Sequence, residues 1–133
     1  MNQKTLLVAL LLLAISSCTI QPKVVLFNNA DEAITISVAE NSVRINSKKS
    51  RKIELYFVRE FEVQLGATQY FYSVDYWPDD YAYFTGWWLF VDRKLKAQFN
   101  ADGTILVLTQ DQDPPISELV GQPRGFPLKP DAK

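Results

Sequence analysis

Short runs of alternating apolar and polar residues dominate the chain after its first two dozen positions. In residues 33–38, aliphatic side chains alternate with a threonine and a serine, and residues 52–57 and 61–65 repeat this pattern. A period of two is the signature of a β-strand with one buried face. Residues 24–27 are apolar throughout, which favours a more deeply buried strand. We therefore expect strands at these four positions.

Polar turn clusters separate the runs, at residues 28–31, 46–49 and 66–69. The clearest hairpin joins residues 95–99 to 104–108, because Gly103 at the end of the connection can adopt a positive φ. Helical spacing is not sustained beyond the N-terminal segment. The pattern predicts an all-β fold: a single-domain antiparallel β-sandwich or small barrel of about seven to nine strands.

Residues 111–133 differ in composition, since they hold five of the seven prolines. Proline cannot donate to a β-ladder, so this segment is not expected to be a central strand. Two interpretations remain. It is an extended tail lying over the domain with Phe126 and Leu128 as apolar contacts, which we favour, or it is a polyproline-type peptide that a partner recognises.

The first 17 residues have the pattern of a secretory signal peptide. Lys4 supplies a positive charge, and residues 6–15 form an uninterrupted apolar run. Ten residues are too few for a transmembrane helix, which needs roughly 17–25. We expect residues 1–17 to be cleaved, residues 18–23 to form a tether, and residues 24–110 to form the β-domain.

The end of this segment, Ile15-Ser16-Ser17-Cys18, resembles the lipobox of bacterial lipoproteins. The resemblance implies a diacylglycerol on the Cys18 thiol, cleavage before Cys18, and a further fatty acid such as palmitate on the new amino group. It also implies membrane anchoring in the cell envelope. Thr19 stands where lipoproteins retained at the inner membrane of enteric bacteria often carry Asp, which favours the outer membrane.

Lipidation also accounts for the cysteine count. Cys18 is the only cysteine in the chain, and an odd cysteine in an exported protein calls for an explanation. Two or three acyl chains give durable membrane anchoring, whereas a single chain is marginal.

Composition then narrows the chemistry. Without its first 17 residues the chain has 116 residues, with 13 Lys and Arg against 15 Asp and Glu, and it has no histidine. No basic face stands out, so nucleic acid is not an expected partner. Without histidine or a free thiolate, the usual catalytic bases and the usual ligands of transition metals are missing. We expect no metal, no cofactor and no enzyme activity.

Among the usual kinds of catalytic and metal-binding chemistry, the composition leaves only those that use carboxylates. Glu60 with Glu62, and Asp111 with Asp113, have the spacing of side chains on one strand face, and a pair across a cleft would allow glycoside hydrolysis. Asp79-Asp80 could contribute oxygen ligands to Ca²⁺. We favour an ordinary turn for Asp79-Asp80, because Pro78 precedes them.

Residues 70–90 hold eleven of the 17 aromatic residues of the chain. We expect two strands, 70–76 and 87–91, bridged by a turn at 78–82. Both faces of each strand carry aromatic side chains, so one set is expected to point away from the core and form a contact surface. The candidate binding residues surround the turn and are Tyr76, Trp77, Asp79, Asp80, Tyr81 and Tyr83.

These observations favour a non-catalytic envelope lipoprotein that binds a protein partner through an aromatic loop and edge. The partner would be an assembly or secretion component, or an enzyme or toxin held inhibited. The alternative is a glycan- or peptidoglycan-binding module, with Trp77, Trp87 or Trp88 stacking on sugar rings. A carboxylate-dependent hydrolase is the third hypothesis.

Overall fold

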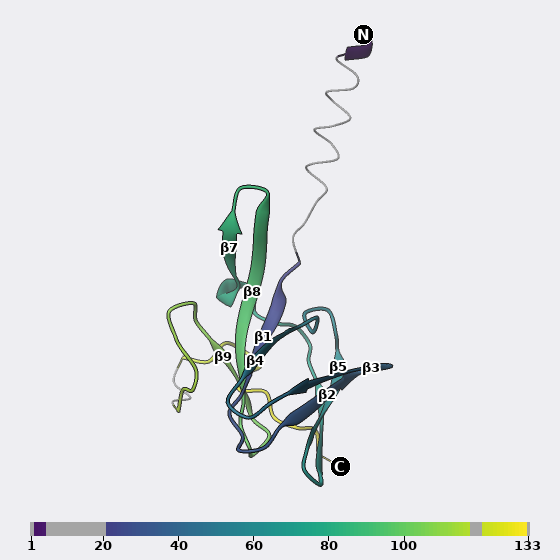
Figure 1. Cartoon of the computed structure of the whole chain (residues 1–133), viewed down its shortest axis with the longest axis vertical. Coiled ribbons are helices and arrows are strands. Elements are labelled where there is room, and N and C mark those ends of the chain that lie inside the picture. The colour runs from purple at the N-terminus through teal and green to yellow at the C-terminus, as the bar shows by residue number, and fades with distance from the viewer. Residues whose placement is uncertain (1, 5–20, 118–120, 133) are drawn as a thin grey trace.

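The computed structural model describes residues 2–4, 21–117 and 121–132, so Cys18 and most of the predicted signal peptide lie outside the described residues. The described chain forms nine strands and one 3-10 turn (Figure 1). The strands are β1 (Lys23–Asn28), β2 (Ile34–Val38), β3 (Asn41–Ile45), β4 (Ser50–Ile53), β5 (Glu60–Leu65), β6 (Thr68–Ser73), β7 (Tyr83–Trp87), β8 (Phe90–Phe99) and β9 (Ile105–Leu108), and the turn η1 is Asp79–Tyr81. They form two sheets packed as a sandwich, which confirms the predicted fold class. Among the described residues, no helix is long and apolar enough to cross a membrane.

The first sheet, sheet A, is organised around the ten-residue strand β8. Along one side of β8, β7 pairs with its first half and β9 with its second half, both antiparallel. The β8–β9 hairpin is the one predicted from the sequence, and Gly103 has φ +89°. On the other side, β1 runs parallel to β8 with Lys23 opposite Lys94, and β4 follows β1. The parallel pairing was not predicted.

The second sheet, sheet B, has the order β3-β2-β5-β6 and is antiparallel throughout. The alternation in β2 and β5 turns Ile34, Ile36 and Val63 into the core, as predicted. The predicted strand 52–57 is too long, because β4 ends at Ile53 and the Phe57 side chain is 69% exposed.

The prediction for residues 70–90 was wrong in topology. Strand β6 ends at Ser73 in sheet B, and β7 begins at Tyr83 in sheet A, so the intervening segment crosses from one sheet to the other. Residues 87–91 are not one strand either. Trp88 and Leu89 form the two-residue turn between β7 and β8, with Trp88 at φ +54°. Such turns usually place Gly or Asn at positive φ, so the sequence carries no local signal for this one.

An aromatic stack fills the space between the sheets. The Phe61 ring stacks on Tyr72 and on Trp77, with centroid distances of 4.9 and 6.4 Å. The Tyr72 hydroxyl is buried and donates to the Gly103 carbonyl oxygen at 2.6 Å. Every residue of the core cluster lies between Val24 and Leu128.

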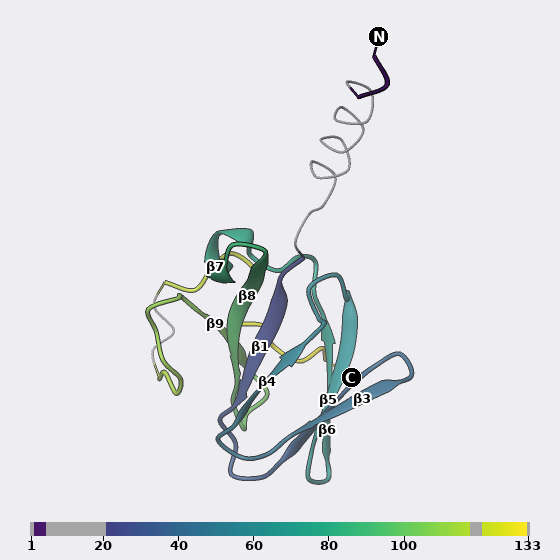
Figure 2. The ribbon, with the colours of Figure 1, turned by 45° about the horizontal axis from the view of Figure 1, so that its top comes forward.

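The proline-rich tail packs against the domain, as we favoured from the sequence, and it joins the two sheets. Leu128 and Ile105 of β9 exchange two backbone hydrogen bonds of 2.8 Å, and the Asp131 N–H donates to the Phe71 carbonyl of β6 at 2.7 Å. The Phe126 ring lies 5.5 Å from Trp77. In Figure 2 the yellow C-terminal segment passes from the β9 side of the sandwich to the sheet B side.

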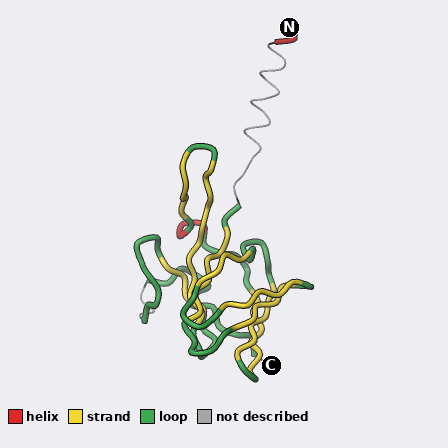
Figure 3. The backbone as a smooth tube through the Cα atoms, in the orientation of Figure 1, coloured by secondary structure: helices red, strands yellow, loops and turns green. Residues whose placement is uncertain are grey.

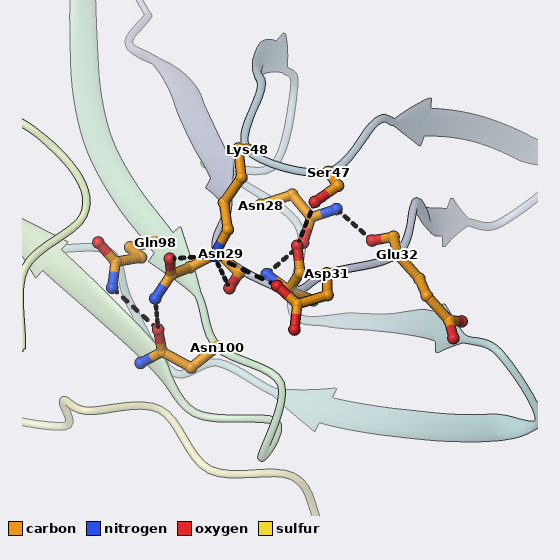
Figure 4. Close-up of polar contacts among 9 residues, drawn as sticks. Asn28, Asn29, Asp31, Glu32, Ser47, Lys48, Gln98 and Asn100 are labelled. Atoms are coloured by element: carbon orange, nitrogen blue, oxygen red, sulfur yellow. Dashed lines mark hydrogen bonds and ion pairs between the residues drawn. The ribbon is translucent and has the colours of Figure 1, made fainter.

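Two buried amides fasten the strand ends (Figure 4). The Asn28 side chain donates to the carbonyls of Glu32 and Ile45, at 2.8 and 3.1 Å, and accepts from the Ala30 N–H at 2.9 Å. This ties the end of β1 to sheet B. The Gln98 side chain donates to the Ile116 carbonyl and accepts from its N–H, both at 2.8 Å, which ties the tail to β8. Each amide has partners for both of its polar atoms, so these two clusters are structural.

Candidate contact surface

The structure separates the predicted binding residues. Trp77 is only 3% exposed and is a core residue, so its prediction as part of an exposed cluster was wrong. The physical reason is the tail, because Phe126 packs against Trp77 and covers it. Tyr76 remains 51% exposed, and its hydroxyl donates to the Arg124 carbonyl at 3.3 Å. The Tyr81 hydroxyl donates to the Gly121 carbonyl at 2.8 Å. These two tyrosines therefore hold the tail as well as facing solvent.

The remaining candidates lie near the base of the β7–β8 hairpin. Asp79 and Asp80 are exposed, and the Asp79 carboxylate lies 3.6 Å from the Arg93 guanidinium. The Lys96 ammonium lies 5.7 Å from the centroid of the Tyr83 ring, and burial raises the pKa of Tyr83. The ion pair links the hairpin to the loop that precedes it, and the Lys96–Tyr83 contact joins its two strands.

The candidate carboxylate pairs lie at the surface. Asp111 and Asp113 are exposed. Glu60 and Glu62 line an open depression of about 420 Å³ beside Phe71 and Asp131, but Glu62 accepts a 2.6 Å hydrogen bond from the Gln69 amide. Among the described residues, no group of three or more Cys, Asp or Glu side chains is placed to hold a metal ion.

The exposed apolar surface lies instead at the far end of the β7–β8 hairpin. Four consecutive large side chains are largely in solvent, and we call them the hairpin tip: Trp87 (79% exposed), Trp88 (75%), Leu89 (84%) and Phe90 (86%). Phe84, lower on β7, is 62% exposed. Figures 1 and 3 show the two strands and their turn projecting beyond the rest of the sandwich. Contiguous exposed apolar side chains of this kind mark contact sites.

Local backbone geometry forms the hairpin tip. Gly86 has φ +98°, and a Cβ placed there would lie 1.9 Å from the Phe90 carbonyl oxygen, so only glycine fits. The following turn reverses the chain at Trp88 and Leu89. The Trp87 and Trp88 rings meet edge to face, with centroids 6.0 Å apart.

Charged residues surround the lower half of the hairpin. The Arg93 guanidinium lies 5.6 Å from the centroid of the Phe84 ring. The Lys52 ammonium binds the Asp92 carboxylate at 3.1 Å, and this hydrogen bond is the main cause of the lowered pKa of Asp92. The tip, in contrast, has no charged residue of its own.

Sequence reasoning listed the Trp87–Phe90 side chains as strand residues and missed the hairpin tip. The available signal was Gly86, followed by four apolar residues and then by the charged run Asp92-Arg93-Lys94. A glycine within a strand pattern marks a bulge or a close backbone approach.

Comparisons with known proteins add no family assignment. No family model matches the sequence, and neither a curated protein nor a solved structure gives a significant match.

Proposed function

We propose that this chain is a non-catalytic lipoprotein of the bacterial cell envelope, anchored through Cys18, which binds a protein partner. The contact is made by the free edge of β7 and by the partly exposed residues Tyr76, Asp79, Asp80, Tyr81 and Tyr83. Thr19, in the position where inner-membrane lipoproteins of enteric bacteria often carry Asp, favours the outer membrane. The partner is an assembly or secretion component, or an enzyme or toxin held inhibited.

The observation that carries this proposal is the position of β7 in its sheet. Strand β7 ends sheet A, and no further strand lies beside it in the part of the chain that the structure describes. Successive residues of β7 direct their backbone N–H and C=O alternately toward β8 and away from it. Trp87, next to the two-residue turn, faces β8, so Phe84, three residues earlier, directs these groups away from β8. An open edge of this kind accepts an added strand from a partner. The exposed rings of Phe84 on β7 and of Tyr76 on the preceding loop would contact its side chains.

The partner proposal is tested by photocrosslinking in cells that make the chain. A photoreactive amino acid at position 85 should give a discrete protein adduct, and the variant Tyr76→Ala/Phe84→Ala should lose it because both exposed rings are removed. Phe57→Ala is the matched control, since Phe57 is 69% exposed on the β4–β5 connection. A parent without an adduct, or an adduct that survives in the double variant, contradicts the proposal.

Lipidation is tested separately. The chain purified from membranes should begin at Cys18 and carry the mass of a diacylglycerol and a fatty acid, whereas Cys18→Ser should leave an unprocessed or unlipidated chain. A parent chain without acyl mass contradicts the anchoring.

Glycan binding is the second candidate, because the Trp87 and Trp88 rings are exposed. Trp77 cannot take part, since the tail covers it. Retention on purified peptidoglycan that is lost in Trp87→Ala/Trp88→Ala would favour this candidate over a protein partner.

A further inference from the structure

We propose that the hairpin tip rests in the same lipid bilayer that holds the Cys18 anchor, so that the domain touches the membrane at two points. This inference rests on the anchoring part of the proposed function. It concerns Trp87–Phe90 and leaves the β7 edge to the protein partner.

The first step is direction. Because β1 runs parallel to β8, the residues that precede Lys23 leave the sheet at the end where the residues that precede Lys94 form the tip. Figures 1 and 2 show the start of β1 and the hairpin at one end of the sandwich. The start of β1 and the tip therefore lie at the same end of sheet A.

The second step is length. Lys23 lies level with Lys94, and the four residues from Lys94 to Phe90 carry the tip about 13 Å further at the strand rise of about 3.3 Å per residue. Cys18 is five residues before Lys23, and five residues span at most about 17 Å. With the strands along the membrane normal, an acylated Cys18 therefore leaves the tip at most a few ångströms from the lipid surface.

The third step is chemistry. Tryptophan side chains favour the boundary between lipid headgroups and hydrocarbon, and leucine and phenylalanine favour the hydrocarbon side of it. The tip offers two Trp, one Leu and one Phe, all at least 75% exposed. Its turn is only two residues long, so few backbone polar groups need accompany the side chains into lipid.

The charged residues near the tip also favour contact with a lipid bilayer. Behind the tip stand Lys94 on β8 and Lys23 beside it on β1, together with Arg93, whose guanidinium lies 3.6 Å from the Asp79 carboxylate. Asp92 is the acidic residue nearest the tip on β8, and Lys52 neutralises it at 3.1 Å. Basic side chains at the level of the headgroups are attracted to anionic lipid.

The test uses tryptophan emission of the anchored chain. Full-length chain is expressed, purified from membranes and reconstituted into vesicles of phosphatidylethanolamine and phosphatidylglycerol with or without brominated acyl chains. In these vesicles the parent should emit at shorter wavelength than the same chain in detergent-free buffer once its acyl groups have been removed. Brominated lipid should reduce the emission of the parent. Trp87→Phe/Trp88→Phe is the matched control, because it keeps only Trp77, which is 3% exposed and should be insensitive to bromine.

The outcomes separate the tip from its anchor. If mass measurement finds no acyl chains on Cys18, its thiol is coupled to a maleimide lipid in the same vesicles, which restores the anchor without the cell's processing. Quenching of the parent in either form supports the tip contact. If brominated lipid removes the same fraction of the emission from parent and control, in both forms, the proposal is overturned. If the tip tryptophans are shielded from solvent only at high protein density, and the chains then crosslink to one another through the tip, the tip contacts a second copy of the chain. That result also overturns the proposal.

Discussion

Replacing Tyr72 by phenylalanine removes one hydroxyl from the centre of the sandwich. That hydroxyl is buried and donates to the Gly103 carbonyl at 2.6 Å, so the variant leaves a buried acceptor without its donor. Loss of one such bond costs about 1.5 kcal/mol, between the net value of an ordinary hydrogen bond and the cost of an unpaired buried group. The ring itself stays stacked on Phe61, so no further packing loss is expected.

The same hydroxyl makes the effect depend on pH. Burial is the largest cause of a pKa of Tyr72 raised far above its ordinary value of 10.0, with smaller contributions from Tyr70 and Asp102. A raised pKa in the folded state gives stability that is complete below pH 10 and is lost as pH rises towards the folded-state pKa. The parent should therefore lose about 1.4 kcal/mol per pH unit from this group above pH 10, and the variant should not. The two stabilities should become equal about one unit above pH 10, near pH 11.

Urea unfolding followed by circular dichroism, from pH 8 to pH 11.5, measures this difference. Tyr76→Phe is the control, because the Tyr76 hydroxyl is at the surface. Its difference from the parent should be small, because removing a surface hydroxyl leaves no buried group unpaired. A Tyr72→Phe deficit that stays constant or grows above pH 10 would show that burial of this hydroxyl does not govern the titration.

Two further substitutions test the hairpins at either end of β8. Gly86→Ala should distort the tip, because its Cβ would collide with the Phe90 carbonyl, and should reduce quenching by brominated lipid in a chain that still unfolds cooperatively. Gly121→Ala, at φ +82° with open space around it, is the control, and equal quenching in both would contradict the steric argument. Asp102→Ala should cost about 1 kcal/mol or less at pH 7, because the exposed Asp102 carboxylate accepts from the Thr104 N–H and hydroxyl at 2.9 and 2.7 Å. Those bonds lower the pKa of Asp102, so its contribution is present above the ordinary value of 3.8 and is lost as pH falls through the folded-state pKa; an equal urea midpoint difference at pH 7 and pH 2 would contradict this.

The elements of this fold that are determined by residues close together in the sequence could be predicted. The alternation of β2 and β5 determines which side chains are buried, and Gly103 marks the β8–β9 turn. The parallel pairing of β1 with β8 could not be predicted, because no local pattern links residues so far apart. Strand β3 was not recognised either, since Asn41, Ser42 and Arg44 are exposed and leave little apolar alternation.

The candidate site was predicted in the right segment but on the wrong residues. Trp77 stands before a proline and two aspartates, a composition typical of an exposed turn, yet its ring packs on Phe61 and is covered by Phe126, almost fifty positions later in the chain. Trp88 occupies a positive-φ turn position that sequence rules assign to glycine or asparagine. In both cases contacts or backbone geometry outside the local pattern decide which aromatic rings are exposed.

The parallel pairing of β1 with β8 also bears on how quickly the domain can fold. Sheet B is assembled from strands that lie within residues 34–73, so its pairings close short loops. Sheet A must instead bring Val24 beside Leu95, and the entropy of closing that loop is lost before any contact of the pair forms. Non-local pairings of this kind are slow to form. We therefore expect the pairing of β1 with β8 to form later than the pairings of sheet B. Until it forms, the apolar side chains of β1 would be open to aggregation or to a chaperone.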